Sequence, residues 1–161
     1  MTAMKRVPAI LITVAAVTAA GMAAHEGFRA KAYDDGAGVQ TVGFGSTRHL
    51  DGSSVKPGDT VTPERAVLML AREADAIWQQ AAACIGDVPL FPHEAAAFQS
   101  LAYNIGAGAF CRSTLVKKLK QTPPDYAGAC REILKWTRAA GRELPGLVKR
   151  RQQEYRTCVS E

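Results

Sequence analysis

Residues 26–45 read EGFRAKAYDDGAGVQTVGFG. This segment carries two acidic side chains nine residues apart, Glu26 and Asp35, and a hydroxyl six residues further on, Thr41. Hydrolysis of a bond between two sugars needs one carboxyl to protonate the leaving oxygen and a second to direct the attack from the opposite side. Acidic residues are common on protein surfaces, so the pair alone proves little. The glycine-rich setting makes these three residues candidates for catalysis.

The residues that follow predict a small sheet and then a long helix. Residues 39–47 alternate loosely between apolar and polar side chains, and Asp51-Gly52 is a turn signal. Thr62-Pro63-Glu64 is typical of a helix start, with Thr as N-cap, Pro at the first helical position and an early acid. Apolar residues continue at helical spacing as far as Ala81, so this helix is long enough to connect two lobes.

The second half of the chain predicts further helices separated by glycine and proline. We expect them over the ranges His93–Ile105, Thr114–Lys120, Asp125–Trp136 and Pro145–Thr157. The predicted fold class is α+β but mainly α. A small N-terminal β-hairpin lobe is joined by a long helix to a C-terminal helical lobe.

Composition places few limits on function. A chain of 161 residues with 47% hydrophobic content forms one domain or two closely joined lobes. The net charge of +5 favours an anionic partner, such as nucleic acid, a membrane surface or an acidic wall polymer, although a basic domain without such a partner is an equal alternative. The one dense basic cluster, Lys149-Arg150-Arg151, has no zinc-finger spacing or RNA-binding aromatic signature beside it, so we expect no nucleic acid.

The N-terminus contains an uncharged apolar run from Val7 to Ala24, preceded by Lys5 and Arg6. Its length lies at the lower end for a helix that spans a bilayer. The basic residues ahead of it orient the N-terminus toward the cytoplasm, which places everything from His25 onward outside.

Three interpretations of this run compete: a cleaved signal peptide, a permanent anchor, and a marginal anchor that leaves the bilayer and joins the folded domain. The run is mostly alanine, which is weakly apolar for a permanent anchor. Cleavage near Ala23 would leave Glu26 about three residues from a free amino terminus, where chains fray. A catalytic acid needs a fixed position, so the third interpretation is favoured.

The four cysteines are Cys84, Cys111, Cys130 and Cys158. None forms a Cys-x-x-Cys pair and no histidine lies at metal-ligand spacing from them, so we expect no metal site. An even number in an exported chain predicts two disulfides, whereas four buried free thiols are the alternative.

Residues 26–45 resemble the T-even phage lysozyme family, including the endolysins of lambdoid phages. The family pattern of Glu-Gly, Arg, Tyr, Asp and Thr-x-Gly-x-Gly is matched here by Glu26-Gly27, Arg29, Tyr33, Asp35 and Thr41-Val42-Gly43-Phe44-Gly45. Tyr103-Asn104-Ile105-Gly106 is similar to the family's cleft-lining turn. Trp136 and the 146–151 run resemble the ending of the lambdoid members. The resemblance covers residues 25–158.

This resemblance implies a muramidase that cuts the β-1,4 bond between N-acetylmuramic acid and N-acetylglucosamine in peptidoglycan. Glu26 would be the general acid, and Asp35 and Thr41 would position the attacking water, with inversion at the anomeric carbon. Tyr103, Asn104 and Phe44 would bind substrate. The resemblance implies no metal or cofactor, and we expect a monomer. Family topology favours Cys84–Cys158 and Cys111–Cys130 as the disulfides.

The N-terminus is similar to that of a subset of these endolysins with a signal-anchor-release segment. The implied domains are residues 1–24 for this segment and residues 25–161 for the catalytic domain. The implied route uses the host secretion machinery, then the periplasmic face of the host inner membrane, then the periplasm. Two alternatives for function are a lytic transglycosylase, which leaves an anhydro sugar, and a membrane-tethered wall-binding protein without catalysis.

Overall fold

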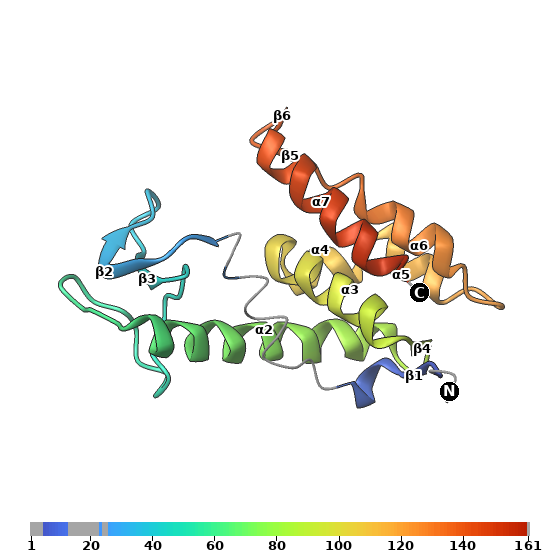
Figure 1. Ribbon diagram of the computed structural model, residues 1–161, viewed down its shortest axis with the longest axis horizontal. Helices are drawn as coiled ribbons and strands as arrows, with labels where there is room; N and C mark the ends of the chain where they lie inside the picture. Colours follow the sequence, from blue (N-terminus) through green and yellow to red (C-terminus); the bar gives the residue numbers. More distant parts are fainter. Residues whose placement is uncertain (1–4, 13–22, 24–25, 161) are drawn as a thin grey trace. The chain divides into compact units, whose positions relative to one another are not determined.

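The computed structural model describes residues 5–12, 23 and 26–160 (Figure 1). The chain forms two compact units. The hairpin unit is Ala15–Ala76, and the helical unit combines Met1–Val14 with Ile77–Glu161. The long helix α2 contributes to both, because the boundary between the units falls within it. The fold is α+β and mainly α, with small antiparallel strand pairs, as the sequence predicted.

The described elements follow one another in a simple order. They are β1 (Val7–Pro8), the 3-10 turn η1 (Ala9–Leu11), β2 (Arg29–Asp34), β3 (Gln40–Gly43), α2 (Pro63–Ile85), β4 (Pro89–Leu90), α3 (Pro92–Ile105), α4 (Ala107–Cys111), α5 (Thr114–Leu119), α6 (Tyr126–Ile133), β5 (Arg138–Ala139), β6 (Arg142–Glu143) and α7 (Pro145–Cys158). The four later helices that the sequence predicted are all present, with ends displaced by up to three residues. The strand β2, the short helix α4 and the β5–β6 hairpin were not predicted.

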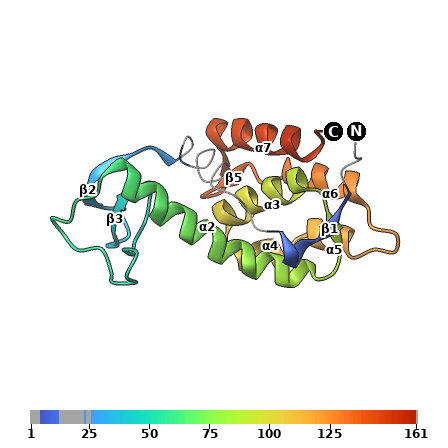
Figure 2. The ribbon, with the colours of Figure 1, turned by 60° about the horizontal axis from the view of Figure 1, so that its bottom comes forward.

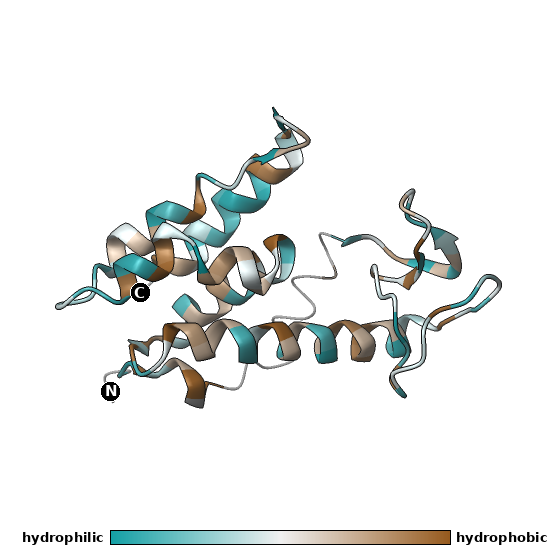
Figure 3. Ribbon diagram, turned by 180° about the vertical axis from the view of Figure 1, so that it is seen from behind, coloured by the Kyte–Doolittle hydropathy of each residue, from teal (hydrophilic) through white to brown (hydrophobic). Residues whose placement is uncertain are grey.

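Helix α2 begins where the sequence predicted. The Thr62 hydroxyl accepts a hydrogen bond from the Arg65 backbone N–H (3.3 Å), which satisfies an N–H group that the helix itself leaves unpaired. Hydrophilic and hydrophobic segments alternate along α2 in Figure 3. This amphipathic pattern lets one face of the helix pack on the core while the other faces water.

The hairpin unit packs β3 onto the first half of α2 (Figure 1). Val42 is fully buried there with Ala66 and Met69. Gly43 makes the close approach possible, because a Cβ atom at this position would lie 2.8 Å from the Ala66 Cβ. Its backbone also has a positive φ of 68°, which side-chain-bearing residues rarely adopt. The first glycine of the Thr-x-Gly-x-Gly sequence, Gly43, is therefore a packing requirement.

The helical unit is built around one apolar core, to which α2 contributes Trp78, Ala81, Ala82 and Ile85 at helical spacing. Helices α3 and α7 lie side by side in both Figure 1 and Figure 2. The β5–β6 hairpin precedes α7, and its turn has positive φ at both Ala140 (50°) and Gly141 (78°). Such a turn matches the twist of a two-residue hairpin.

Two disulfides join helices of this unit. Cys84 on α2 bonds to Cys111 at the end of α4, and Cys130 on α6 bonds to Cys158 at the end of α7. The prediction of two disulfides is confirmed, but the pairing Cys84–Cys158 and Cys111–Cys130 is wrong. The reason is geometric: Cα atoms of the bonded residues lie 5.7 and 5.8 Å apart, within the range that a disulfide can bridge.

The first residues of the predicted membrane segment pack on the helical unit. We call residues 5–12 the N-terminal arm. Val7 and Pro8 pair with Leu90 and Pro89 in an antiparallel bridge, and Ala9 is fully buried in the core. The rest of the predicted segment, apart from Ala23, lies outside the described residues. Within the residues that are described, no helix combines the length and the apolar character needed to cross a membrane.

Candidate active site

Glu26 is the first residue of the described stretch 26–160. Its backbone is helical, and Gly27 follows with a φ of 69°, the left-handed conformation in which helices commonly end. The Glu26 side chain is exposed. The Glu-Gly pair therefore couples an acid to a backbone reversal, after which the chain enters β2.

The loop between β2 and β3 is held by two consecutive carboxylates. Asp34 Oδ1 accepts the backbone N–H groups of Gly36 (2.8 Å) and Gly38 (3.1 Å). Asp35 Oδ1 accepts those of Ala37 (2.8 Å) and Val39 (3.2 Å). Side-chain hydrogen bonds of this kind replace the backbone pairing that a loop lacks. Asp34 was not predicted to matter, although its place in the Asp-Asp-Gly sequence is a recognisable turn signal.

Thr41 lies on β3 opposite Tyr33 of β2. Its side chain is buried, and its hydroxyl donates a hydrogen bond to the Val39 carbonyl oxygen (3.3 Å). Thr41 and Asp35 are thus both bonded to the backbone of the same residue. The Arg29 guanidinium lies 4.4 Å from the centre of the Tyr33 ring on the same strand, which braces β2 by a cation–π contact.

Phe44 follows β3 and packs on the apolar cluster of the hairpin unit. Its ring also contacts that of Phe28, with centroids 5.4 Å apart and planes tilted by 53°. Phe28 is 39% exposed, which is unusual for an aromatic side chain. Sequence reasoning singled out Phe44 but missed Phe28, whose position two residues after Glu26 was the available signal.

The loop between β3 and α2 is fixed by a second polar network. His49 Nε2 lies 2.8 Å from Asp59 Oδ2, and the same oxygen accepts the Lys56 backbone N–H at 2.8 Å. The hydrogen bond with His49 holds the pKa of Asp59 below its usual range. A pocket of about 270 Å³ beside this loop is lined by residues that include His49 and Arg72. None of the predicted site residues lines it.

Tyr103 and Asn104 lie in the last turn of α3, in the helical unit. Asn104 is exposed, and its Oδ1 accepts a hydrogen bond from Arg151 Nη2 at 3.0 Å. Glu26, Asp35, Thr41 and Phe44 all belong to the hairpin unit. The predicted residues therefore fall into one group of acids and a hydroxyl around the β2–β3 hairpin, and one polar group at the end of α3.

Comparison with known proteins identifies the family. Residues 23–154 match the family model described as phage lysozyme. The chain belongs to the phage lysozyme family. The chain is 41% identical over 137 residues to an endolysin of Acyrthosiphon pisum secondary endosymbiont phage 1, which covers 81% of this chain and 86% of that protein. It is 33% identical over 152 residues to a SAR-endolysin of Enterobacteria phage P21. This match covers 92% of this chain and 87% of that protein.

Solved structures agree with this assignment. A mutant of P22 lysozyme superposes with a TM-score of 0.80 at 31% identity, covering 93% of this chain and all of that one. The chain is therefore a glycoside hydrolase of the lysozyme class, and its activity is hydrolysis of peptidoglycan. The described part of the chain contains no group of three or more His, Cys, Asp or Glu side chains placed to hold a metal ion.

Proposed function

We propose that this phage lysozyme is an inverting muramidase that cuts the β-1,4 bond between N-acetylmuramic acid and N-acetylglucosamine. Glu26 donates a proton to the oxygen of the leaving sugar. Asp35 accepts a proton from a water that attacks the anomeric carbon from the opposite face, and Thr41 holds that water. Asn104, Tyr103 and Phe44 bind the glycan.

The observation that carries this proposal is that Asp35 and Thr41 both form hydrogen bonds with the backbone of Val39. The Val39 N–H donates to Asp35 Oδ1 (3.2 Å), while the Val39 carbonyl accepts from the Thr41 hydroxyl (3.3 Å) and from the Asp35 N–H (3.1 Å). One peptide segment thus fixes the carboxylate and the hydroxyl relative to each other. Positioning of this kind is what a water-activating pair requires.

The direction of these hydrogen bonds supports the role that we propose for each atom. Both N–H groups bonded to Asp35 reach Oδ1, so Oδ2 is the oxygen that serves as the base. Thr41 uses its one hydroxyl proton on Val39, so its oxygen acts toward water as an acceptor. A water that donates one proton to Asp35 and the other to Thr41 directs a lone pair away from both, toward the sugar.

The decisive test is Glu26→Gln, which keeps the size of the side chain and removes the acid. We expect clearing of purified cell walls to slow by about 10²–10⁴-fold, the usual contribution of general acid catalysis. Unchanged clearing would overturn the catalytic assignment. Mass spectrometry of wild-type products separates the alternatives. Hydrolysis adds one water per cut, a lytic transglycosylase gives anhydro sugars, and a wall-binding protein gives no products. NMR of the newly formed anomer reports inversion.

We also propose that residues 1–24 are a signal-anchor-release segment, so that residues 25–161 form the catalytic domain. The segment uses the host secretion machinery, tethers the enzyme at the inner membrane and then releases it into the periplasm. The alanine-rich run of residues 7–24 supports this, as do relatives named SAR-endolysins from phages P21 and PS119.

The contacts of the N-terminal arm support the idea that release adds the segment to the folded enzyme. Arg6 makes two hydrogen bonds to the Glu94 carboxylate (2.9 and 3.1 Å) and lies over the rings of Phe91 (4.2 Å) and Tyr126 (3.8 Å). The Trp78 indole N–H donates to the Ile12 carbonyl oxygen at 2.9 Å. A chain held in the bilayer from residue 7 would leave the buried Glu94 without this cation.

Strengthening the anchor tests this second proposal. Replacing Ala19, Ala20 and Gly21 with leucine raises the apolar character of the run, and we expect the enzyme to stay in the membrane fraction and not to lyse cells. The matched control replaces the same residues with serine, which weakens the run. Normal lysis by a membrane-retained leucine variant would contradict tethering as a means of inhibition.

A further inference from the structure

The side chain of Asn104 is exposed, yet one end of its amide is fixed by a buried cation. Its Oδ1 accepts a hydrogen bond from Arg151 Nη2 at 3.0 Å. Arg151 on α7 has no exposed surface. A guanidinium carries five N–H donors and no acceptor, so it binds the oxygen of an amide and excludes the NH₂ group. The orientation of the Asn104 amide is therefore set from inside the protein.

Arg151 is itself held by a buried carboxylate. Glu154 lies one helical turn further along α7, with its Oε2 2.8 Å from Arg151 Nε and its Oε1 3.2 Å from Nη2. The same Oε1 accepts the Ser100 hydroxyl of α3 at 2.6 Å. Ser100 and Asn104 are four residues apart on α3, so they share one helix face. The network thus ties the last turn of α3 to α7 at two points.

We infer that Arg151 is a positioning residue that makes Asn104 a fixed hydrogen-bond donor. With Oδ1 bonded to Arg151, the NH₂ group is the part of the amide that the exposed side chain presents to a ligand. This inference rests on the proposed role of Asn104 in glycan binding and specifies its chemistry.

The group that a fixed donor selects is an oxygen that can only accept. A sugar hydroxyl can turn to donate or accept, so it discriminates little between the two ends of an amide. The carbonyl oxygen of an acetamido group has no proton and accepts only. Both sugars of peptidoglycan carry this group, and we assign it as the partner of the Asn104 NH₂.

The test measures binding of soluble oligosaccharides to Glu26→Gln enzyme by calorimetry, so that no substrate is consumed. The substitution Asn104→Asp keeps an oxygen for Arg151 and replaces the outward NH₂ with a second oxygen. We expect affinity for tetra-N-acetylchitotetraose to fall about tenfold, the usual value for one lost hydrogen bond. The preference for this oligomer over its de-N-acetylated form should shrink by a similar factor. Unchanged affinity and preference would overturn the inference.

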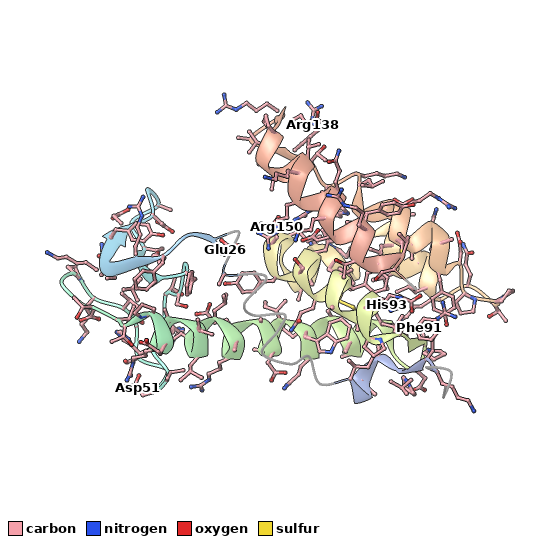
Figure 4. All side chains as sticks on the ribbon, in the orientation of Figure 1. Glu26, Asp51, Phe91, His93, Arg138 and Arg150 are labelled. Atoms are coloured by element: carbon pink, nitrogen blue, oxygen red, sulfur yellow. A yellow bond between two sulfur atoms is a disulfide. The ribbon has the colours of Figure 1, made fainter. Side chains whose placement is uncertain are left out.

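The role of Arg151 is tested separately from that of Asn104. Arg151→Met removes this cation and still leaves the buried Glu154 paired with Arg150, whose Nε lies 3.2 Å from Glu154 Oε1. In the Glu26→Gln background we expect the same loss of preference for the acetylated oligomer. In the enzyme with Glu26 intact, we expect a rise in KM on cell walls with little change in kcat. Arg138→Met is the matched control, because it removes a cation from the exposed β5 strand (Figure 4). Thermal unfolding confirms that each variant is folded.

Two failures are distinguishable. If Glu26→Gln still clears cell walls, the proposed catalytic function is wrong whatever Asn104 does. If Glu26→Gln is inactive but Asn104→Asp binds the acetylated oligomer as the parent does, the enzyme assignment stands. In that case only the donor role of Asn104 and the positioning role of Arg151 are lost.

Discussion

In the loop between β2 and β3, exposed carboxylates accept backbone N–H groups, whereas in the helical unit buried carboxylates pair with cations. Asp34 and Asp35 represent the first kind. Glu94, Glu132 and Glu154 represent the second, with exposed fractions of 3%, 6% and 4%. Their partners are Arg6 for Glu94, Lys118 and Lys135 for Glu132, and Arg150 and Arg151 for Glu154.

The difference separates carboxylates that stay available for reaction, Asp34 and Asp35 alike, from carboxylates whose charge is used for structure. Backbone N–H groups fix the geometry of a carboxylate and leave it a full negative charge that can take a proton from water. A buried cation at hydrogen-bond distance cancels that charge and occupies the oxygens. The type of donor around a carboxylate is therefore more informative than its burial alone.

The largest effect is expected from Asp35→Asn compared with Asp34→Asn. Both variants keep an oxygen that can accept the two loop N–H groups, so the loop loses little in either. If Asp35 is the base, wall hydrolysis should fall by about 10²–10⁴-fold for Asp35→Asn and stay within about twofold for Asp34→Asn. Turbidity assays on purified walls provide the measurement. Equal losses in the two variants would mean that the loop, not the base, was damaged.

Arg6→Met should destabilise the folded protein. The buried Glu94 would lose its two charge-assisted hydrogen bonds, and a buried charge without its partner typically costs 3–5 kcal/mol. Because a third of the Arg6 side chain is exposed to water, we expect a smaller value of about 2 kcal/mol. Denaturant unfolding measures the difference. Lys5→Met is the control, since it removes the neighbouring, exposed charge. Equal stability of the two variants would contradict a structural role for the arm.

Gly43→Ala tests whether packing on α2 is what keeps the hairpin in place. The new methyl group would lie 2.8 Å from Ala66 Cβ on a backbone with positive φ, so we expect a loss of about 2–3 kcal/mol. Gly45→Ala also has a positive φ (100°) but meets no atom within 4 Å. It should lose only about 1 kcal/mol. Similar losses of stability at both positions would show that glycine is needed at position 43 only for its positive φ, and not for the close contact with Ala66.

The sequence could predict those features that depend on residues close together in the chain. The start of α2 at Pro63 follows from Thr62-Pro63-Glu64, because capping involves residues close together in the chain. The candidate site at the β2–β3 hairpin could be proposed from the sequence for the same reason, since its acids and glycines lie within twenty residues. The periodic apolar positions of α3 and α7 likewise indicated helices to within a few residues.

Interactions between distant residues were not predictable from such local signals. Arg6 and Glu94 are 88 positions apart, and the sequence around each of them does not indicate the other as its partner. The disulfide pairing failed because it depends on where α4 ends relative to α2, and α4 itself was not predicted. The proposed role of Asn104 as a donor depends on Arg151, 47 positions away, which the sequence shows only as part of the basic cluster Lys149-Arg150-Arg151.

The smallest effect concerns the pH and salt dependence of Glu132. Its hydrogen bond from Lys135, with a further contribution from Lys118, lowers the pKa of this carboxyl below its usual range. A lowered pKa in the folded state adds stability above the usual carboxyl pKa, and this is lost as pH falls through the folded value. Glu132→Gln should therefore flatten the loss of stability below about pH 4.5, as followed by thermal unfolding.

Salt separates the two kinds of carboxylate in the same experiment. Asp51 also has a lowered pKa, but its cause is hydrogen bonding from the Ser53 hydroxyl and N–H. An ion pair is screened by salt, whereas a hydrogen bond from a neutral group is not. Raising the salt concentration to about 1 M should reduce the difference in stability between wild type and Glu132→Gln. The difference in stability between wild type and Asp51→Asn should stay unchanged. If both differences shrank equally, the distinction between carboxylates bonded to neutral donors and carboxylates paired with cations would fail.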